Sequence, residues 1–445
     1  MTLDLQRFFN ATDPGKTLFS EKNEEDQKYY IDFSSVRGGQ IIEELRDNIV
    51  LWSPNKATCQ LFTGHIGCGK STELLRLKAQ LEQENFHVVY FESSQDLEMG
   101  DVDVSDILLA IARQVSSSLE QMNLDRPREL AHILQEAARL LQTEIDFSAE
   151  VKTPIAKVGA DSQGKFSLDV GIAKITAKAK ASPTLRSKLR GYLEPLTNGL
   201  LDAINQELLE PGIEQLKKHG KKGLVAIVDN LDQISSSPKA WKRPQHEYLF
   251  VDRGEQLREL HCHVVYTMPL SLRFSNDFEN LTQRFRNDPK VLPMVPIKSR
   301  DGKENEEGMQ LLRQMVLARA FPDLDANQRG DRISEVFDDM ETLNHLCRIS
   351  GGHVRNLLRL LNDSIKKEKG LPISRKSLQD VIQGYSNERR LAIDDSEREL
   401  LHQVAKEKKV LGDRNYQILI RSMFVYEYRD DRGSWFDVNP IVAEE

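Results

Sequence analysis

GHIGCGKS, residues 64–71, is the stretch that decides the fold of this chain. In this stretch Gly64 is followed, after four residues, by Gly69, Lys70 and Ser71. This spacing indicates a loop whose backbone N–H groups turn inward around phosphates. Lys70 adds a cation for the outer phosphates, Ser71 offers a hydroxyl to Mg²⁺, and the helix that begins here points its positive end at the same anion. A plain glycine-rich turn is the alternative interpretation. The residues expected to hold the nucleotide phosphates are Gly64, His65, Ile66, Gly67, Cys68, Gly69, Lys70, Ser71 and Thr72.

The segments around this loop have the pattern of a parallel sheet. A short apolar run at 59–63 leads into the loop, and leucines at helical spacing follow it. Further apolar runs alternate with helical patterns, and prolines place the last run near an edge; the runs cover 87–91, 224–229, 262–267 and 291–295. The sequence therefore predicts an α/β fold, a P-loop NTPase core with a parallel five-stranded sheet.

The run at 224–229 ends in a carboxylate, as the Walker B strand of P-loop proteins does. We expect Asp229, together with Ser71, to coordinate Mg²⁺. Asp232 is the best local candidate to orient or deprotonate an attacking water, and a turn cap is its structural alternative.

The rest of the chain divides into four predicted segments. An N-terminal arm and lead-in helix (1–55) precede the core (56–303), which contains a lysine-rich insertion at about 145–182 with one alternating, strand-like run at 166–170. An all-α lid (304–393) follows. Two helices and a hairpin then predict a small winged-helix domain (394–445).

Composition narrows the class of protein. Hydrophobic residues make up 39% and charged residues 29%, and no apolar run approaches the roughly 18 residues of a bilayer span. The start lacks a signal peptide, so we expect a cytoplasmic protein with no membrane span. Four scattered cysteines argue against a disulfide framework or a zinc ribbon. A net charge of -8 gives no general attraction to nucleic acid.

Asp229-Asn230-Leu231-Asp232 resembles the motif of the KAP and STAND ATPases, which are related to AAA+ proteins in the division with an additional strand between the P-loop and Walker B strands. The resemblance implies that residues 262–267 form this strand and that Thr267, at its end, senses the terminal phosphate. Many AAA+ enzymes carry glutamate where this chain has Asn230, so we expect a slow ATPase.

Ile349 to Arg355 resembles a lid motif in which Gly-x-Pro-Arg opens a helix and sends arginine to the nucleotide. Val354 replaces the proline, and the resemblance implies that Arg355 contacts phosphate; a plain helix stop and start is the alternative. Candidates for an arginine finger supplied by a neighbouring subunit are Arg273, Arg284 and Arg286, unless these are ordinary solvated arginines.

The Asn-Lys-x-Asp signature of GTPases is not found after the core strands, which favours ATP. Tyr29, Tyr30 and Arg37 are placed to stack on adenine, or to pack in the core. Asn439 stands where STAND switches carry a histidine that approaches ADP, which implies an ADP contact; an Asn-Pro turn is the alternative.

Two functions remain open at this point. One is a STAND-type molecular switch that binds and hydrolyses ATP with Mg²⁺, changes conformation or forms a homo-oligomer, and signals to an unidentified protein partner, for example in defence. The other is a DNA-directed AAA+-type ATPase, similar to origin or transposition ATPases. The presumed recognition helix carries only Arg414 and Arg421, so nucleic acid is possible but not favoured.

Overall fold

The computed structural model describes residues 3–18, 24–122, 124–125, 127–142, 168–239, 242–412 and 414–443. At its centre is a five-stranded sheet of parallel strands in the order β2-β3-β4-β1-β5. This confirms the predicted α/β class. β4 lies between β1 and β3, as the additional strand should, and β5 is at an edge. The bounds are β1 Cys59–Gly64, β2 His87–Glu92, β3 Leu224–Asp229, β4 His263–Thr267 and β5 Lys290–Leu292.

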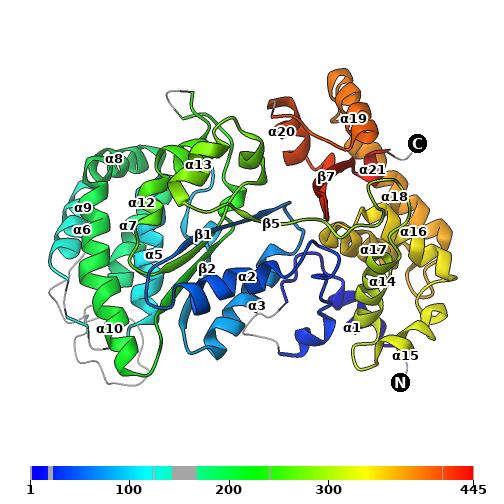
Figure 1. Ribbon diagram of the computed structural model, residues 1–445, viewed down its shortest axis with the longest axis horizontal. Helices are drawn as coiled ribbons and strands as arrows, with labels where there is room; N and C mark the ends of the chain where they lie inside the picture. The colour runs from blue at the N-terminus through cyan, green and yellow to red at the C-terminus, as the bar shows by residue number, and fades with distance from the viewer. Residues whose placement is uncertain are drawn as a thin grey trace.

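Successive side chains of each strand point to opposite faces of the sheet, and both faces are covered by helices (Figure 1). Leu61 belongs to the large cluster formed with α5 and the helices beyond it, while Phe62 belongs to the cluster formed with α2 and α3. The core helices are α2 Ile41–Asp47, α3 Lys70–Gln83, α4 Ser93–Asp96, α5 Val104–Ser118, α6 Glu129–Leu140, α7 Leu168–Lys180, α8 Pro183–Leu193, α9 Thr197–Ile204, α10 Glu210–Lys218, α11 Gln245–Glu247, α12 Gly254–Arg258 and α13 Phe278–Phe285.

The strand predicted at 166–170 is wrong in its described part, because Leu168 begins helix α7. Leu168, Ile172 and Ile175 recur at helical spacing, and all three are buried in the cluster that includes α5. Burial of this stripe favours the helix over the short alternating run seen in the sequence. The remainder of the predicted insertion, up to residue 167, lies outside the described residues.

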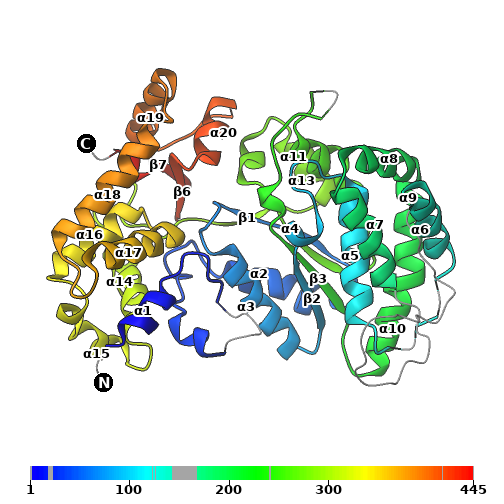
Figure 2. The same cartoon turned by 180° about the vertical axis from the view of Figure 1, so that it is seen from behind.

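Helices α14–α18 form a second layer beside the sheet, with its own apolar cluster. The N-terminal arm joins this cluster: helix α1 (Leu5–Ala11) lies against α14, as both Figure 1 and Figure 2 show, and Phe8 and Phe33 are buried there. The arm therefore connects these helices with the core. The helices are α14 Glu306–Ala320, α15 Ala326–Gly330, α16 Met340–Ser350, α17 Val354–Glu368 and α18 Arg375–Arg390.

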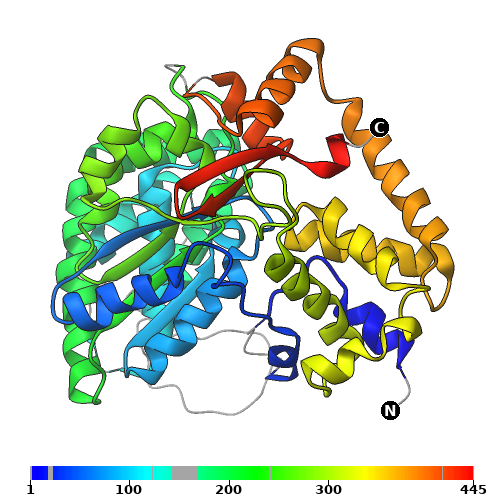
Figure 3. The same cartoon turned by 45° about the vertical axis from the view of Figure 1, so that its right-hand side comes forward.

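The tail has the predicted order of two helices and a hairpin, and its hairpin lies between the sheet and helices α14–α18 (Figure 3). Tyr426 and Trp435 belong to the same cluster as α2 and α3. The Met294 N–H, just beyond β5, donates to the Glu427 carbonyl over 2.9 Å. The tail elements are α19 Asp395–Glu407, α20 Arg414–Arg421, β6 Val425–Asp430, β7 Gly433–Val438 and α21 Pro440–Ala443. Within the described ranges, no helix has both the length and the apolar character needed to cross a bilayer.

Candidate functional site

The loop between β1 and α3 has the geometry that its sequence predicts. Gly67 has φ of 84°, and a Cβ there would fall 2.8 Å from a ring carbon of His353. Gly64 has φ of 156°, and a Cβ would fall 2.5 Å from the Leu292 carbonyl oxygen. Glycine is therefore required by close neighbours as well as by backbone conformation.

Lys70, the first residue of α3, is buried and turned inward. Its Nζ donates to the carbonyl oxygens of Gly64 and His65, both at 2.8 Å, and lies 3.0 Å from Asp232 Oδ2. Burial by itself lowers the pKa of this ammonium, but the Asp232 carboxylate raises it, and the net shift is upward. Lys70 is thus charged and has three acceptors within the protein.

Asp229 ends β3 beside the start of α3. Tyr90, on the neighbouring strand β2, donates its hydroxyl to Asp229 Oδ2 over 2.8 Å, and the Asn230 N–H donates to Oδ1 over 2.7 Å. Ser71 also hydrogen-bonds the carboxylate. Burial raises the pKa of Asp229, and these hydrogen bonds oppose the rise. Ser71 and Asp229, predicted from separate motifs, are therefore in contact.

A carboxylate beside a hydroxyl at a phosphate loop fits Mg²⁺, which proteins hold through one or two such oxygens while water and phosphate complete the shell. Asp232 follows on the 3₁₀ turn Leu231–Gln233. Its Oδ2 faces Lys70, and its buried Oδ1 has no hydrogen-bond partner among the described residues. An unpaired buried carboxylate oxygen is a candidate acceptor for a water or a substrate proton.

Arg355 reaches the loop from helix α17, which begins at Val354 as predicted. The Arg355 N–H donates to the Gly67 carbonyl over 3.2 Å, and its side chain lines the cavity above the loop. His353, the N-cap of α17, donates from Nε2 to the Ile66 carbonyl over 2.8 Å and accepts the Asn356 N–H at Nδ1. Helix α17 is therefore bonded directly to the phosphate loop.

Tyr426 of β6 joins the loop and α17 from the other side. Its ring stacks on His353 and meets His65 edge-on, with centroids 5.6 Å apart in each pair. Its hydroxyl accepts from Asn356 Nδ2 over 2.8 Å, and His65 Nε2 accepts the Glu427 N–H over 2.9 Å. Burial lowers the pKa of both histidines, that of His353 to about 3, so both rings are neutral. We call His65, His353 and Tyr426 the aromatic joint.

The cavity above the loop has a volume of about 100 Å³. Tyr29, Tyr30 and Arg37 of the N-terminal arm line it, as do the loop, the turn after β3 and helix α17. The Tyr30 hydroxyl donates to Glu73, and Arg37 donates to the Cys68 carbonyl over 3.0 Å. Small-molecule pockets usually enclose about 300–1,000 Å³, so this cavity is smaller than the volume that such ligands occupy.

Four predicted site residues do not line this cavity: Gly64 and His65 at the start of the loop, and Thr267 and Asn439, which lie outside the loop. Thr267 is buried; its Oγ1 accepts the Leu231 N–H over 2.9 Å and thereby holds the turn after β3. Asn439 donates from Nδ2 to the Met423 carbonyl and accepts the Ile441 N–H at Oδ1. Neither residue lines the cavity. Asn439 instead has the contacts of the turn that was its structural alternative.

Two of the three arginine-finger candidates form ion pairs with carboxylates of this chain. Arg273 pairs with Glu427 of β6, and Arg284 lies 3.5 Å from Glu255. Arg286 ends α13 in the left-handed conformation. The pairing of Arg273 fixes the hairpin to the segment after β4.

Sequence reasoning missed Tyr90 and the aromatic joint. Tyr90 could be placed beside Asp229 only once β2 was known to neighbour β3. His65 and His353 were each part of a recognised motif, but neither motif indicates that a tyrosine from the tail packs between them.

The parallel sheet, the additional strand and the loop at the end of β1 together define a P-loop NTPase core. No protein-family model matches the chain, and no curated protein matches it. Similar solved structures include Drosophila ORC bound to DNA (11% identity, 98% of this chain and 90% of that chain covered, TM-score 0.35). They also include the Aeropyrum pernix ORC2 protein in ADPNP-ADP complexes (11%, 96% and 95%, 0.36) and the Walker-type ATPase PABY2304 of Pyrococcus abyssi (9%, 94% and 98%, 0.36). TM-scores this low do not establish a shared function.

Proposed function

We propose that this protein is a Mg²⁺-dependent ATPase whose lid and tail respond to the bound nucleotide. The observation that carries the proposal is the convergence of Lys70, Ser71, Asp229 and Asp232, from two separate motifs, at the end of the parallel sheet. The loop N–H groups hold the phosphates, and Ser71 with Asp229 holds Mg²⁺, which supplies positive charge to the phosphate oxygens.

Nucleotide binding on this proposal is an exchange of anions at Lys70. The ammonium leaves Asp232 for the phosphates, and Asp232 is then free to accept a proton from the attacking water. Arg355 adds a second cation from α17, so the position of that helix depends on the nucleotide.

The test is steady-state hydrolysis of ATP, and of GTP for comparison, with and without Mg²⁺. We expect ATP to be preferred and hydrolysis to require Mg²⁺, and Asp229→Asn to reduce the rate at least about tenfold while ATP still binds. Hydrolysis by Asp229→Asn at the parent rate would remove Asp229 from the site.

The two functions left open by the sequence, a STAND-type switch and a DNA-directed ATPase, differ in the molecule on which the ATPase acts. A DNA-directed ATPase is suggested by the compared proteins, one of which is an ORC bound to DNA. The tail argues against DNA binding. Its presumed recognition helix, α20, carries two arginines, and one of them, Arg421, is already hydrogen-bonded to Ser236 of the core. This favours the STAND-type switch. We favour a switch that forms a homo-oligomer with ATP.

Mass measurement with ATP, with ADP and with added duplex DNA distinguishes the two. Assembly with ATP alone supports the switch. A complex with DNA, together with hydrolysis that DNA stimulates, would establish the DNA-directed ATPase instead.

A further inference from the structure

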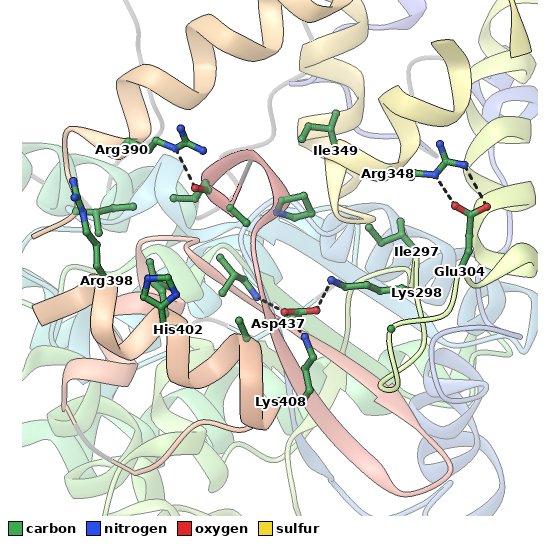
Figure 4. A pocket seen from close by; sticks show the side chains of 18 of the residues that line it. Ile297, Lys298, Glu304, Arg348, Ile349, Arg390, Arg398, His402, Lys408 and Asp437 are labelled. Carbon is green, nitrogen blue, oxygen red and sulfur yellow. Dashed lines mark hydrogen bonds and ion pairs between the residues drawn. The ribbon is translucent and has the colours of Figure 1, made fainter. Parts of the chain in front are cut away.

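A second cavity, of about 990 Å³, lies between the lid helices and the tail (Figure 4). Its walls come from α16, α18, α19, β7 and the segment after β5. It shares no lining residue with the cavity above the phosphate loop. A ligand here would contact the lid and the tail at the same time.

The lining of this cavity is positively charged, although the chain as a whole has a net charge of -8. Five cationic side chains face two carboxylates, a local net charge of +3 with histidines neutral; they are Lys298, Arg348, Arg390, Arg398 and Lys408, against Glu304 and Asp437. Such a local excess favours an anionic ligand.

Part of this charge is already compensated within the protein, and part is not. Arg348 pairs with Glu304 and with Glu341, while Lys298 and Lys408 share Asp437 at 2.7 and 2.8 Å. Arg390 donates from Nε to the Val442 carbonyl over 3.2 Å. Within the described ranges, no carboxylate pairs with Arg390 or with Arg398, whose side chains project from α18 and α19 on the same side of the cavity (Figure 4).

The same cavity also has an apolar surface. Ile349, Ile393, Leu401 and Val442 contribute to it, and all four are buried. Leu401 lies one turn from Arg398 on α19, so one face of this helix offers both a cation and an apolar side chain. An inorganic ion would leave this surface uncovered.

We propose that this cavity binds a small molecule that combines two or more phosphate groups with an apolar or aromatic part. Guanidinium groups bind phosphate oxygens in pairs, which suits the two arginines without carboxylate partners. The volume is at the upper end of the range of about 300–1,000 Å³ that small ligands occupy. The bound molecule bridges α18 and α19, which both line the cavity, and so stabilises the position of the tail independently of the P-loop site.

The experiment is titration calorimetry of ADP into the full chain. We expect two binding sites, of which Arg390→Gln/Arg398→Gln loses one and Lys70→Ala loses the other. The matched control Lys376→Gln/Lys406→Gln removes the same charge from exposed positions on the same two helices and keeps both sites. Arg398→Glu alone, which changes a single exposed side chain, weakens the second site about tenfold or more.

Several results would overturn the proposal. A single ADP site in the parent that Arg390→Gln/Arg398→Gln keeps, or two sites in Arg398→Glu with unchanged affinities, excludes the cavity as an ADP site. Pyrophosphate binding there as tightly as ADP shows that the apolar surface is not used. Duplex DNA bound by the parent but not by Arg398→Glu, with one ADP site in both, assigns the cavity to nucleic acid. If the P-loop does not bind ADP, Lys70→Ala should bind ADP as the parent does, while the arginine variants still lose the cavity site.

Discussion

Lys70 is expected to contribute to protein stability as well as to ligand binding. Its ammonium is buried against Asp232, so removing it leaves a buried carboxylate without its cation. We expect Lys70→Ala to lose nucleotide binding and also about 3 kcal/mol of stability. Lys70→Ala/Asp232→Asn should regain much of that stability without regaining binding. Urea denaturation of the parent, both single variants and the double variant measures the coupling, and additive losses would show that the pair is not formed.

On the proposed function, Asp232 and the nucleotide phosphates compete for the ammonium of Lys70. Asp232→Asn removes this competition, so we expect ATP to bind at least as tightly as in the parent while turnover falls at least about tenfold. Calorimetry and steady-state rates on one preparation test both parts. Parent-like turnover would place the base elsewhere.

Asn439 supports the turn after β7 through five hydrogen bonds to backbone groups, three made by its own backbone and two by its side-chain amide. We expect Asn439→Ala to reduce the free energy of unfolding by about 1–3 kcal/mol, because buried backbone groups lose their partners. Release of a fluorescent ADP, followed by stopped flow, should be unchanged. A faster release would restore the ADP contact that the family resemblance implied.

Tyr426 connects the hairpin to the loop between β1 and α3 and to α17 through the aromatic joint. Tyr426→Ala leaves a gap between two imidazoles and should cost about 3–5 kcal/mol. Tyr426→Phe keeps the ring and loses the hydroxyl with its hydrogen bonds to Asn356 and Asn439, which should cost about 1 kcal/mol for each bond. The effect of ATP on proteolysis of α19 and α20 should persist in the Phe variant and disappear in the Ala variant; equal behaviour of the two would exclude coupling through the ring.

The elements that could be predicted from sequence are those with a strong local pattern. Buried strands ending in a glycine loop or a carboxylate gave β1 and β3 almost to the residue, and Val354 was correctly placed at the start of α17. Helix α7 was mistaken for a strand because its first residues alternate. Thr267 and Asn439 were assigned to the site by resemblance, whereas their side chains are satisfied by nearby backbone groups. Packing partners distant in sequence, such as Tyr90 and Asp229, leave no local pattern.

At the scale of the whole molecule, four buried histidines make stability depend on pH. Burial lowers the pKa of His353 to about 3 and of His246 and His263 to about 4, and that of His65 is also lowered. The unfolded chain, with histidine pKa near 6.5, binds more protons than the folded chain between those values. The contribution of these histidines to stability is therefore complete above about pH 6.5 and falls as pH decreases, by up to about 1.4 kcal/mol per pH unit for each histidine. Burial raises the pKa of Asp106 to about 6, and this carboxyl opposes the loss by one proton.

Urea midpoints at several values between pH 7.5 and 4.5 measure this slope. His353→Gln removes one titrating group, so the stability of the variant should fall less steeply with pH. The slope should correspond to the uptake of nearly one proton fewer on unfolding than in the parent. An identical slope in the variant and the parent would show that His353 is protonated in the folded protein.

The bond from the Glu427 N–H to His65 joins residues at opposite ends of the chain. During synthesis the ribosome completes the β1 loop long before it releases β6, and domains form from the N-terminus as the nascent chain emerges. The contacts of Tyr426 with His65 and His353 can therefore form only after β6 has been synthesised. A polypeptide released before β6 would carry the β1 loop without the ring that packs on it, so this site depends on the synthesis of a hairpin far along the chain.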